Sequence, residues 1–324
     1  MNATEPRLKF VQLSDIHLMR PGDCRCWWMT DSPDKLLQQA IAQVNAIPDL
    51  DFAVFTGDLV DKADAACFQR FQAIVSQLNV PYYCSVGNHD IDDVPPELVV
   101  DDRFNRHDFI GWCRNQFFFK PAPTGLAEFS ASPRPGIRLI AIDASIGTHP
   151  DPQGVIRSQQ LEWLQSELDA HPHDVVIVLI HQPPIASVFF RKYRILPAQA
   201  KQLCRVLASH SHVAAVLSGH LHVPKMYARH STAFLTAPPL IGPVSAFRTI
   251  EIAAVASPAP SSRPAWGQLI YRWHRVRLDE AAPTPLWHAF AMGTRSDRQG
   301  IFSVNLPPSW TSAPSRTPAV AGSS

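Results

Sequence analysis

The sequence predicts an α/β fold, because short apolar strand-like runs alternate with segments whose apolar residues repeat at helical spacing. The composition agrees: 46% of the 324 residues are apolar and 18% are charged, which is typical of a globular protein with a large core. The expected strands are apolar almost throughout, as strands buried on both faces are. They span residues 8–14, 52–56, 81–86, 137–143, 175–180 and 213–218.

Four helices are expected between these strands. The first begins at Ser32-Pro33, because serine is a favoured N-cap residue and proline is favoured at the first helical position. The apolar residues that define the four helical faces are Leu37, Ala40, Ile41, Val44 and Ile47; Phe68, Phe71, Val75 and Leu78; Leu161, Leu164 and Leu168; and Leu203, Val206 and Leu207.

After about residue 232 the pattern changes to shorter strand candidates at residues 234–236, 245–254 and 268–278, with proline-rich punctuation between them. We therefore expect a core domain over residues 1–240 and a β-rich extension over residues 241–306. This extension would pack on the core as a lid or a dimer contact. Residues 307–324 are rich in Pro, Ser, Ala and Thr, which predicts a disordered tail.

The charge pattern excludes some classes of protein. There are 29 Lys and Arg residues against 28 Asp and Glu residues, and 29 − 28 gives a formal net charge of +1. A chain without a basic stripe is not expected to have nucleic acid as its main partner. No apolar run approaches the roughly 20 residues of a spanning helix, so no membrane is expected as a partner.

The start of the chain and its cysteines predict a cytoplasmic protein. Met1 to Arg7 are followed directly by a strand-like run, without the apolar stretch of a signal peptide. Six cysteines in a chain of this length form no disulfide framework. Cys24 and Cys26 invite a zinc or redox interpretation, but no second thiol pair accompanies them, so two free thiols in a loop are favoured.

Side chains that can bind metals follow the ends of five expected strands. In an open α/β sheet this edge is where ligands bind. Asp15 and His17 point the same way, since side chains alternate along an extended chain, and Gly57 allows a tight turn before Asp58. The metal-ligand candidates are Asp15, His17, Asp58, Asn88, His181, His220 and His222.

Carboxylate, amide and imidazole ligands without thiolates suit Mn²⁺, Fe²⁺ or Fe³⁺, and Zn²⁺. These ligands are too many for one tetrahedral zinc ion, whereas two divalent ions that share Asp58 and a hydroxide fit them. Such a pair of ions suits in-line displacement at phosphorus. The sequence therefore predicts phosphoester hydrolysis.

The ordered motifs Asp15-x-His17, Gly57-Asp58, Gly87-Asn88-His89-Asp90, His181 and Gly219-His220-x-His222 resemble the calcineurin-like metallophosphoesterase family. The resemblance spans residues 8–240. The Leu-Ser-Asp-Ile-His start and the Asn-His-Asp motif are most similar to class III cyclic-nucleotide phosphodiesterases and related glycerophosphodiesterases. The resemblance implies a four-layer αββα sandwich with the metals between the carboxyl ends of two sheets.

The resemblance also implies a role for each residue. One metal takes Asp15, His17, Asp58 and His222, and the other takes Asp58, Asn88, His181 and His220. The nucleophile is the hydroxide that bridges the two ions. The catalytic residue is His89, which faces the scissile phosphate and stabilises charge or protonates the leaving alkoxide.

Some further residues have both a functional and a structural interpretation. Asp61 and Asp90 could orient metal-bound imidazoles or cap loops. Arg20, Trp27, Trp28 and His149 could line a substrate pocket, although apolar packing for the tryptophans and a solvated Arg20 are the commoner roles.

The favoured function is hydrolysis of small phosphodiesters, with 3′,5′-cyclic nucleotides, cAMP above all, as the first candidate. The alternative is a broad-specificity glycerophosphodiesterase or phosphomonoesterase with the same metal core. A metal-free interaction module is disfavoured, because no ligand position is substituted. The expected partner is a small phosphodiester, and a homodimer or higher homo-oligomer is left open.

Overall fold

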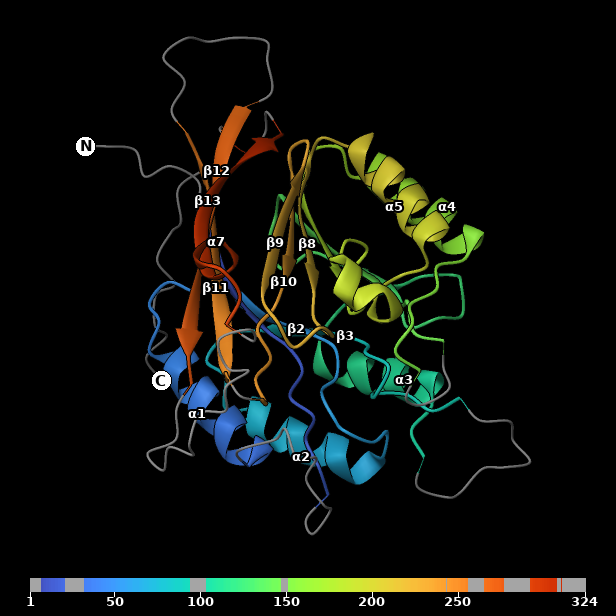
Figure 1. Cartoon of the computed structure of the whole chain (residues 1–324), viewed down its shortest axis with the longest axis vertical. Coiled ribbons are helices and arrows are strands. Elements are labelled where there is room, and N and C mark those ends of the chain that lie inside the picture. The colour runs from blue at the N-terminus through green and yellow to red at the C-terminus, as the bar shows by residue number, and fades with distance from the viewer. Residues whose placement is uncertain are drawn as a thin grey trace, which may run out of the picture.

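In the computed structural model of the chain, two β-sheets pack face to face and helices cover both outer faces (Figure 1). The structure describes residues 7–20, 32–93, 103–146, 151–242, 244–255, 265–276, 292–307 and 310. Three clusters of buried apolar side chains fill the three interfaces between the layers. The expected four-layer αββα sandwich is confirmed.

The first sheet has the strand order β13-β12-β11-β1-β2-β3. Its strands β1, β2 and β3 are parallel, whereas β11, β12 and β13 are antiparallel additions on the other side of β1. The bounds are β1 Arg7–Leu13, β2 Phe52–Thr56, β3 Tyr82–Ser85, β11 Ala246–Ala254, β12 Ala265–Arg275 and β13 Gln299–Leu306.

The second sheet has the strand order β4-β5-β6-β7-β8-β10-β9. Its centre, from β6 to β10, is parallel, and β7 and β8 are buried along their whole length, as their uninterrupted apolar sequences predict. The bounds are β4 Lys120–Pro121, β5 Phe129–Ala131, β6 Ile137–Ile142, β7 Val175–Ile180, β8 Val213–Ser218, β9 Lys225–Arg229 and β10 Thr232–Thr236.

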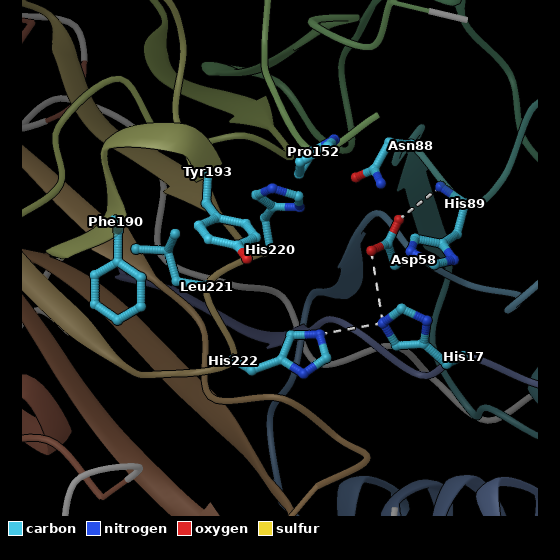
Figure 2. Close-up of a pocket in the computed structure, with 10 residues that line it drawn as sticks. All are labelled: His17, Asp58, Asn88, His89, Pro152, Phe190, Tyr193, His220, Leu221 and His222. Atoms are coloured by element: carbon cyan, nitrogen blue, oxygen red, sulfur yellow. Dashed lines mark hydrogen bonds and ion pairs between the residues drawn. The ribbon is translucent and has the colours of Figure 1, made fainter. Parts of the chain in front are cut away.

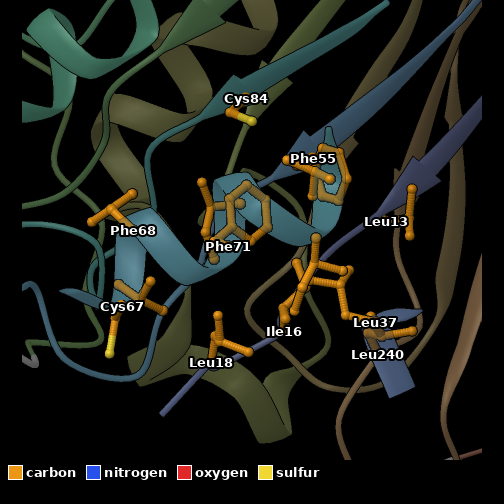
Figure 3. Close-up of a cluster of buried hydrophobic side chains, with 14 of the residues drawn as sticks. Leu13, Ile16, Leu18, Leu37, Phe55, Cys67, Phe68, Phe71, Cys84 and Leu240 are labelled. Atoms are coloured by element: carbon orange, nitrogen blue, oxygen red, sulfur yellow. The ribbon is translucent and has the colours of Figure 1, made fainter. Parts of the chain in front are cut away.

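Helices α1 Pro33–Asn45, α2 Ala65–Val75 and α3 Arg106–Gln116 cover the first sheet, and α4 Ser158–Ala170 and α5 Pro197–Ala208 cover the second (Figure 1). Figure 3 shows part of the apolar layer under α1 and α2. Ser32 is the N-cap of α1 as expected, but its side chain makes no capping hydrogen bond. Leu78 lies beyond the end of α2, so that predicted helical face is shorter. Within the described residues, none of the helices has the length and apolar character that a membrane span requires.

The β-rich region after residue 240 continues the first sheet. β11 pairs with β1 from Arg7 opposite Ala253 to Gln12 opposite Arg248. The role of this region as a lid or dimer contact stays a prediction. Of the predicted tail, residues 307–324, the structure describes only Pro307 and Trp310. Trp310 is buried in the core between the sheets.

Candidate metal centre

The loops that follow β1, β2, β3, β7 and β8 bring the predicted metal ligands together at one edge of the sandwich (Figure 2). A cavity of about 370 Å³ lies over them. Its lining residues are His17, Asp58, Asn88, His89, Pro152, Phe190, Tyr193, His220, Leu221 and His222.

The backbone at five predicted ligands lies in the left-handed region, where residues other than glycine are uncommon. The φ values are 54° at Asp15, 46° at His17, 51° at Asp58, 71° at His220 and 52° at His222. Such conformations cost about 1–3 kcal/mol each and persist where the surrounding structure holds them, which is typical of functional sites.

Two glycines allow the ligand loops to approach one another. A Cβ atom at Gly57, whose φ is 88°, would lie 2.5 Å from Nδ1 of His181. A Cβ atom at Gly87 would lie 2.3 Å from Oδ1 of Asp58. Both contacts are too short for any side chain, so glycine is required at these positions for the ligands to meet.

One group of ligands is formed by Asp15, His17 and His222. Nε2 of His17 lies 3.1 Å from Nε2 of His222, which in turn lies 3.3 Å from Oδ1 of Asp15. Asp58 completes the group, with Oδ2 3.6 Å from Nε2 of His17. These are the four residues expected around the first metal.

A second group is formed by Asp58, His181 and His220. Nε2 of His181 lies 3.0 Å from Oδ2 of Asp58 and 3.2 Å from Nδ1 of His220. Nδ1 of His181 is 2.7 Å from the carbonyl oxygen of Thr56, which can only accept, so Nδ1 keeps a proton and Nε2 is the ring nitrogen that can bind a metal. Asn88, the remaining expected ligand, lines the same cavity and lies 3.5 Å from the Gln182 amide.

The buried polar atoms of this cluster fit divalent ions. Within the described part of the chain, Oδ2 of Asp15 and Nε2 of His220 are buried and have no hydrogen-bond partner. Burying such atoms without a partner is costly, and a cation bound in each of the two groups would satisfy them. The donor set of carboxylates, an amide and imidazoles without thiolates suits Mn²⁺, iron or Zn²⁺.

A sequence profile for the calcineurin-like phosphoesterases matches residues 8–224, which is more than half of the chain. The chain belongs to the calcineurin-like phosphoesterase family. This family consists of phosphoester hydrolases, and the resemblance predicted from the motifs is confirmed.

Two curated relatives of the chain carry names that specify a diester substrate. A cAMP/cGMP dual specificity phosphodiesterase from Mycobacterium tuberculosis is 32% identical over 228 residues, which are 68% of this chain and 64% of the relative. The chain thus spans less than two thirds of that relative's length. A probable glycerophosphodiester phosphodiesterase from Arcobacter nitrofigilis is 26% identical over 215 residues, which are 65% of this chain and 71% of the relative.

Solved structures show the same fold. A dimetal phosphatase from Danio rerio superposes on the chain with a TM-score of 0.63 at 16% sequence identity. The superposition covers 85% of this chain and 98% of that chain. This likeness supports the fold alone.

Burial and neighbouring charges set the protonation of the ligand cluster. Burial, reinforced by the neighbouring His181, lowers the pKa of His220 to about 3, so this imidazole is neutral at pH 7. Burial alone would raise the pKa of Asp58, but the facing imidazoles of His181 and His89 hold it well below its ordinary value. For His181 burial lowers the pKa, yet the Asp58 carboxylate outweighs this and raises it to about 9. A bound cation would displace that proton.

His89 is held at the edge of the cluster by two contacts. Its backbone N–H donates to Oδ1 of Asp58 at 3.0 Å, and its ring Nδ1 lies 2.8 Å from the carbonyl oxygen of Asp61. Because that carbonyl can only accept, Nδ1 carries a proton. Nε2 is therefore the ring nitrogen that can exchange a proton with a substrate. The side chain lines the cavity, where it can meet a bound phosphate (Figure 2).

Asp61 and Asp90 have different surroundings. Oδ1 of Asp61 lies 3.4 Å from Nδ1 of His17, a position from which it can orient that ring. The Asp90 carboxylate contacts backbone instead: Oδ1 accepts from the N–H groups of Leu59 and Val60, and Oδ2 accepts from Gly87. Asp90 therefore ties together the loops that follow β2 and β3.

The structure places Arg20 away from the cavity lining, where its Nε donates to Oδ2 of Asp64 at 3.0 Å. Trp27, Trp28 and His149, proposed as pocket residues, and the thiols of Cys24 and Cys26 lie outside the described residues.

An apolar wall that sequence reasoning missed faces the metal ligands. It consists of Pro152, Phe190, Tyr193 and Leu221. Phe190 and Tyr193 belong to the short 3₁₀ segment η2 Val188–Tyr193, and the Tyr193 ring lies 5.9 Å from the His220 ring (Figure 2). The run of aromatic residues soon after His181 was the signal that could have indicated this wall.

Proposed function

We propose that the chain is a binuclear metal-dependent phosphodiesterase for small phosphodiesters, with 3′,5′-cyclic nucleotides, and cAMP first, as its substrates. The observation that carries the proposal is the position of Asp58, which belongs to both ligand groups. Its Oδ2 atom lies 3.0 Å from Nε2 of His181 and 3.6 Å from Nε2 of His17. Mn²⁺, iron and Zn²⁺ are the ions expected at these ligands.

Two bound ions would supply positive charge to the phosphoryl oxygens and activate water for in-line attack. The chain itself supplies the remaining parts of the reaction. His89 holds a proton on Nδ1 through the Asp61 carbonyl and presents Nε2 to the phosphate side of the cavity. From there an imidazolium stabilises developing charge or gives its proton to the leaving alkoxide.

The shape of the cavity supports a diester with an organic group. Its lining combines charged and imidazole side chains with apolar residues, among them Phe190 and Tyr193. An aromatic surface can stack on a nucleobase. The name of the Mycobacterium tuberculosis relative points to the same substrates.

A broad glycerophosphodiesterase or phosphomonoesterase is the second candidate. The relative from Arcobacter nitrofigilis, named for glycerophosphodiesters, favours it. A metal-free interaction module is disfavoured, because all seven predicted ligands are present and lie close together. The cytoplasmic location and the oligomeric state stay predictions.

A substrate panel tests the proposal. The full chain is supplied in turn with Mn²⁺, Fe²⁺ and Zn²⁺ and is assayed on cAMP, bis(p-nitrophenyl) phosphate, a glycerophosphodiester and a phosphomonoester. We expect metal-dependent cleavage of both cAMP and the artificial diester. Preference for the glycerophosphodiester or the monoester would favour the second candidate, and no cleavage with any metal would contradict the proposed function.

A further inference from the structure

The buried amide of Gln12 joins the two sheets at the ends of the strands that lead into the ligand loops. Its Nε2 donates to Oγ1 of Thr56 in the first sheet at 3.1 Å, and to the carbonyl oxygen of Ser218 in the second sheet at 3.0 Å. Thr56 ends β2 two residues before Asp58, and Ser218 ends β8 two residues before His220. One side chain thus connects the strand ends that carry ligands from opposite sheets.

Gln12 lies at a position where the fold would accept an apolar side chain. Leu8 and Phe10, which precede it on the same face of β1, both belong to the apolar core between the sheets. Gln12 itself is completely buried. Burying an amide costs free energy unless its polar atoms are hydrogen-bonded, and an apolar residue would avoid that cost. A hydrogen-bonded polar group in a core instead specifies how the elements that it joins are placed.

The neighbours of the Gln12 amide determine its orientation. Arg248 lies opposite Gln12 on the neighbouring strand β11, and its guanidinium donates to Oε1 of Gln12 at 3.5 Å. The carbonyl oxygen of Ser218 can only accept, so it has to face Nε2. With a donor on one side and an acceptor on the other, the amide cannot turn over without losing both contacts.

The two strand ends that Gln12 joins are in close contact with the ligands themselves. The carbonyl oxygen of Thr56 lies 2.7 Å from Nδ1 of His181. A Cβ atom at Gly219, the residue that follows Ser218, would lie 2.7 Å from Oδ2 of Asp15. Because the loops of the two sheets are packed this closely, a shift of one sheet against the other would displace the ligands.

We propose that Gln12 is a positioning residue of the metal centre, which sets the spacing between the ligands of the first sheet and those of the second. Both ligand groups combine residues from the two sheets. In the first group, His222 follows β8 whereas Asp15 follows β1. In the second group, His181 follows β7 whereas Asp58 follows β2. Two ions that share a ligand require a fixed spacing of these side chains, and the inference therefore rests on the proposed binuclear centre.

Titration of the full chain, purified free of metal, with Mn²⁺ tests this role. Gln12→Met has a side chain of similar length and removes both hydrogen bonds that Nε2 donates. The matched control is Thr232→Val, because Thr232 is also buried and its Oγ1 donates at 2.9 Å to the carbonyl oxygen of Val213, at the opposite end of β8 from Ser218. Calorimetry measures the affinity for each ion. Electron paramagnetic resonance distinguishes a coupled pair of Mn²⁺ ions from isolated ions.

We expect wild type and Thr232→Val to bind two Mn²⁺ ions that give a coupled signal. Gln12→Met should bind the second ion about tenfold or more weakly, in the range typical of residues that orient metal ligands, and should show mainly the signal of isolated ions. A folded Gln12→Met with the affinities and the coupled signal of wild type would overturn the inference. Failure of wild type itself to bind a coupled pair would contradict the proposed binuclear centre, and the inference with it.

A second pair of variants decides the question if Gln12→Met does not fold. Thr56→Val removes the hydroxyl that accepts from Gln12, whereas Thr56→Ser keeps it. Thr56→Ser should therefore bind the second Mn²⁺ ion several-fold more tightly than Thr56→Val. Thermal unfolding of each metal-free variant, followed by circular dichroism, shows whether the fold is kept. Equal Mn²⁺ binding by the two folded Thr56 variants would overturn the inference.

Discussion

Asp58 and His89 are joined by a hydrogen bond in which the backbone N–H of His89 donates to Asp58 Oδ1 at 3.0 Å. The other oxygen, Oδ2, faces His17 and His181. One carboxylate thus belongs to both ligand groups and also fixes the loop that carries the proposed acid. Substitution of Asp58 should therefore lower both the metal content and the turnover, whereas substitution of His89 should lower the turnover alone.

Asp58→Ala removes the ligand that both groups share. We expect the purified variant to hold less metal and its turnover to fall by more than about 100-fold. Metal analysis by mass spectrometry and diester assays check this. Asp169→Ala, at an exposed aspartate of α4, is the matched control. Retention of both metals and full activity by Asp58→Ala would contradict its bridging role.

His89→Ala removes the proposed proton donor but none of the ligands in the two groups. Turnover should fall by about 100-fold to 10,000-fold, the usual range for a general acid, while metal content stays near wild type. His107→Ala, which alters an exposed histidine of α3, should behave as wild type. Wild-type turnover in His89→Ala would show that this side chain does not take part in the reaction.

Asp90→Ala removes the acceptor of three backbone N–H groups, from Leu59, Val60 and Gly87. Since each buried donor left without a partner costs about 1–3 kcal/mol, the free energy of unfolding should fall by about 3 kcal/mol or more. Urea titration measures this. Asp90→Asn keeps one acceptor oxygen and should lose less. An unfolding free energy equal to that of wild type would mean that the loops are held together by other contacts.

Tyr193→Ala removes the ring nearest to His220 in the apolar wall. If this ring stacks on the nucleobase, KM for cAMP should rise about fivefold or more, with a smaller change in kcat. Tyr193→Phe should stay close to wild type, as should Phe118→Ala, at a residue that is 96% exposed elsewhere. An unchanged KM in Tyr193→Ala would place the base on another surface.

Glu128 gives the stability a dependence on pH. Burial raises its pKa to about 7, although Gln160 and Thr124 donate hydrogen bonds that oppose the shift. The folded state thus binds this proton more tightly than the unfolded chain, whose glutamate has its ordinary pKa of about 4.3. The stabilisation that this proton gives to the folded state is fully present below the unfolded-state pKa of about 4.3. It is lost as pH rises through the folded-state pKa of about 7.

Urea titration at pH 5, 6, 7 and 8 tests this by comparing wild type with Glu128→Gln. The stability of wild type relative to the variant should decrease over this range, by a few kcal/mol in total. Glu162→Gln, at an exposed residue of α4, is the control. A difference between wild type and Glu128→Gln that does not vary with pH would show that Glu128 titrates alike in both states.

The sequence was sufficient for the parts of the fold that are buried on both faces. The strands expected at residues 52–56, 175–180 and 213–218 have those bounds in the structure, because continuous apolar sequence is what such strands require. Strands β4, β5, β9 and β13 and helices α3 and α7 Arg295–Arg298 were missed. β4 is two exposed residues long, and α3 buries only Phe109 and Cys113, so neither shows a clear periodic pattern.

The predicted metal ligands come together because each directly follows a strand, and the order of strands in the sheets then fixes their position. The apolar wall could not be predicted in this way. Tyr193 reaches His220 from a 3₁₀ segment that starts several residues after β7, and its path depends on packing that no local pattern reports.

The pairing of β11 with β1 has a consequence during synthesis of the chain. One edge of β1 is completed by β2 soon after it leaves the ribosome, but the other edge has to wait for Ala246–Ala254. About 230 residues separate the two strands, so at typical translation speeds this edge stays open for roughly 10 to 50 s. An open edge can pair with the edge of another nascent chain, which makes this interval the period of greatest risk of aggregation.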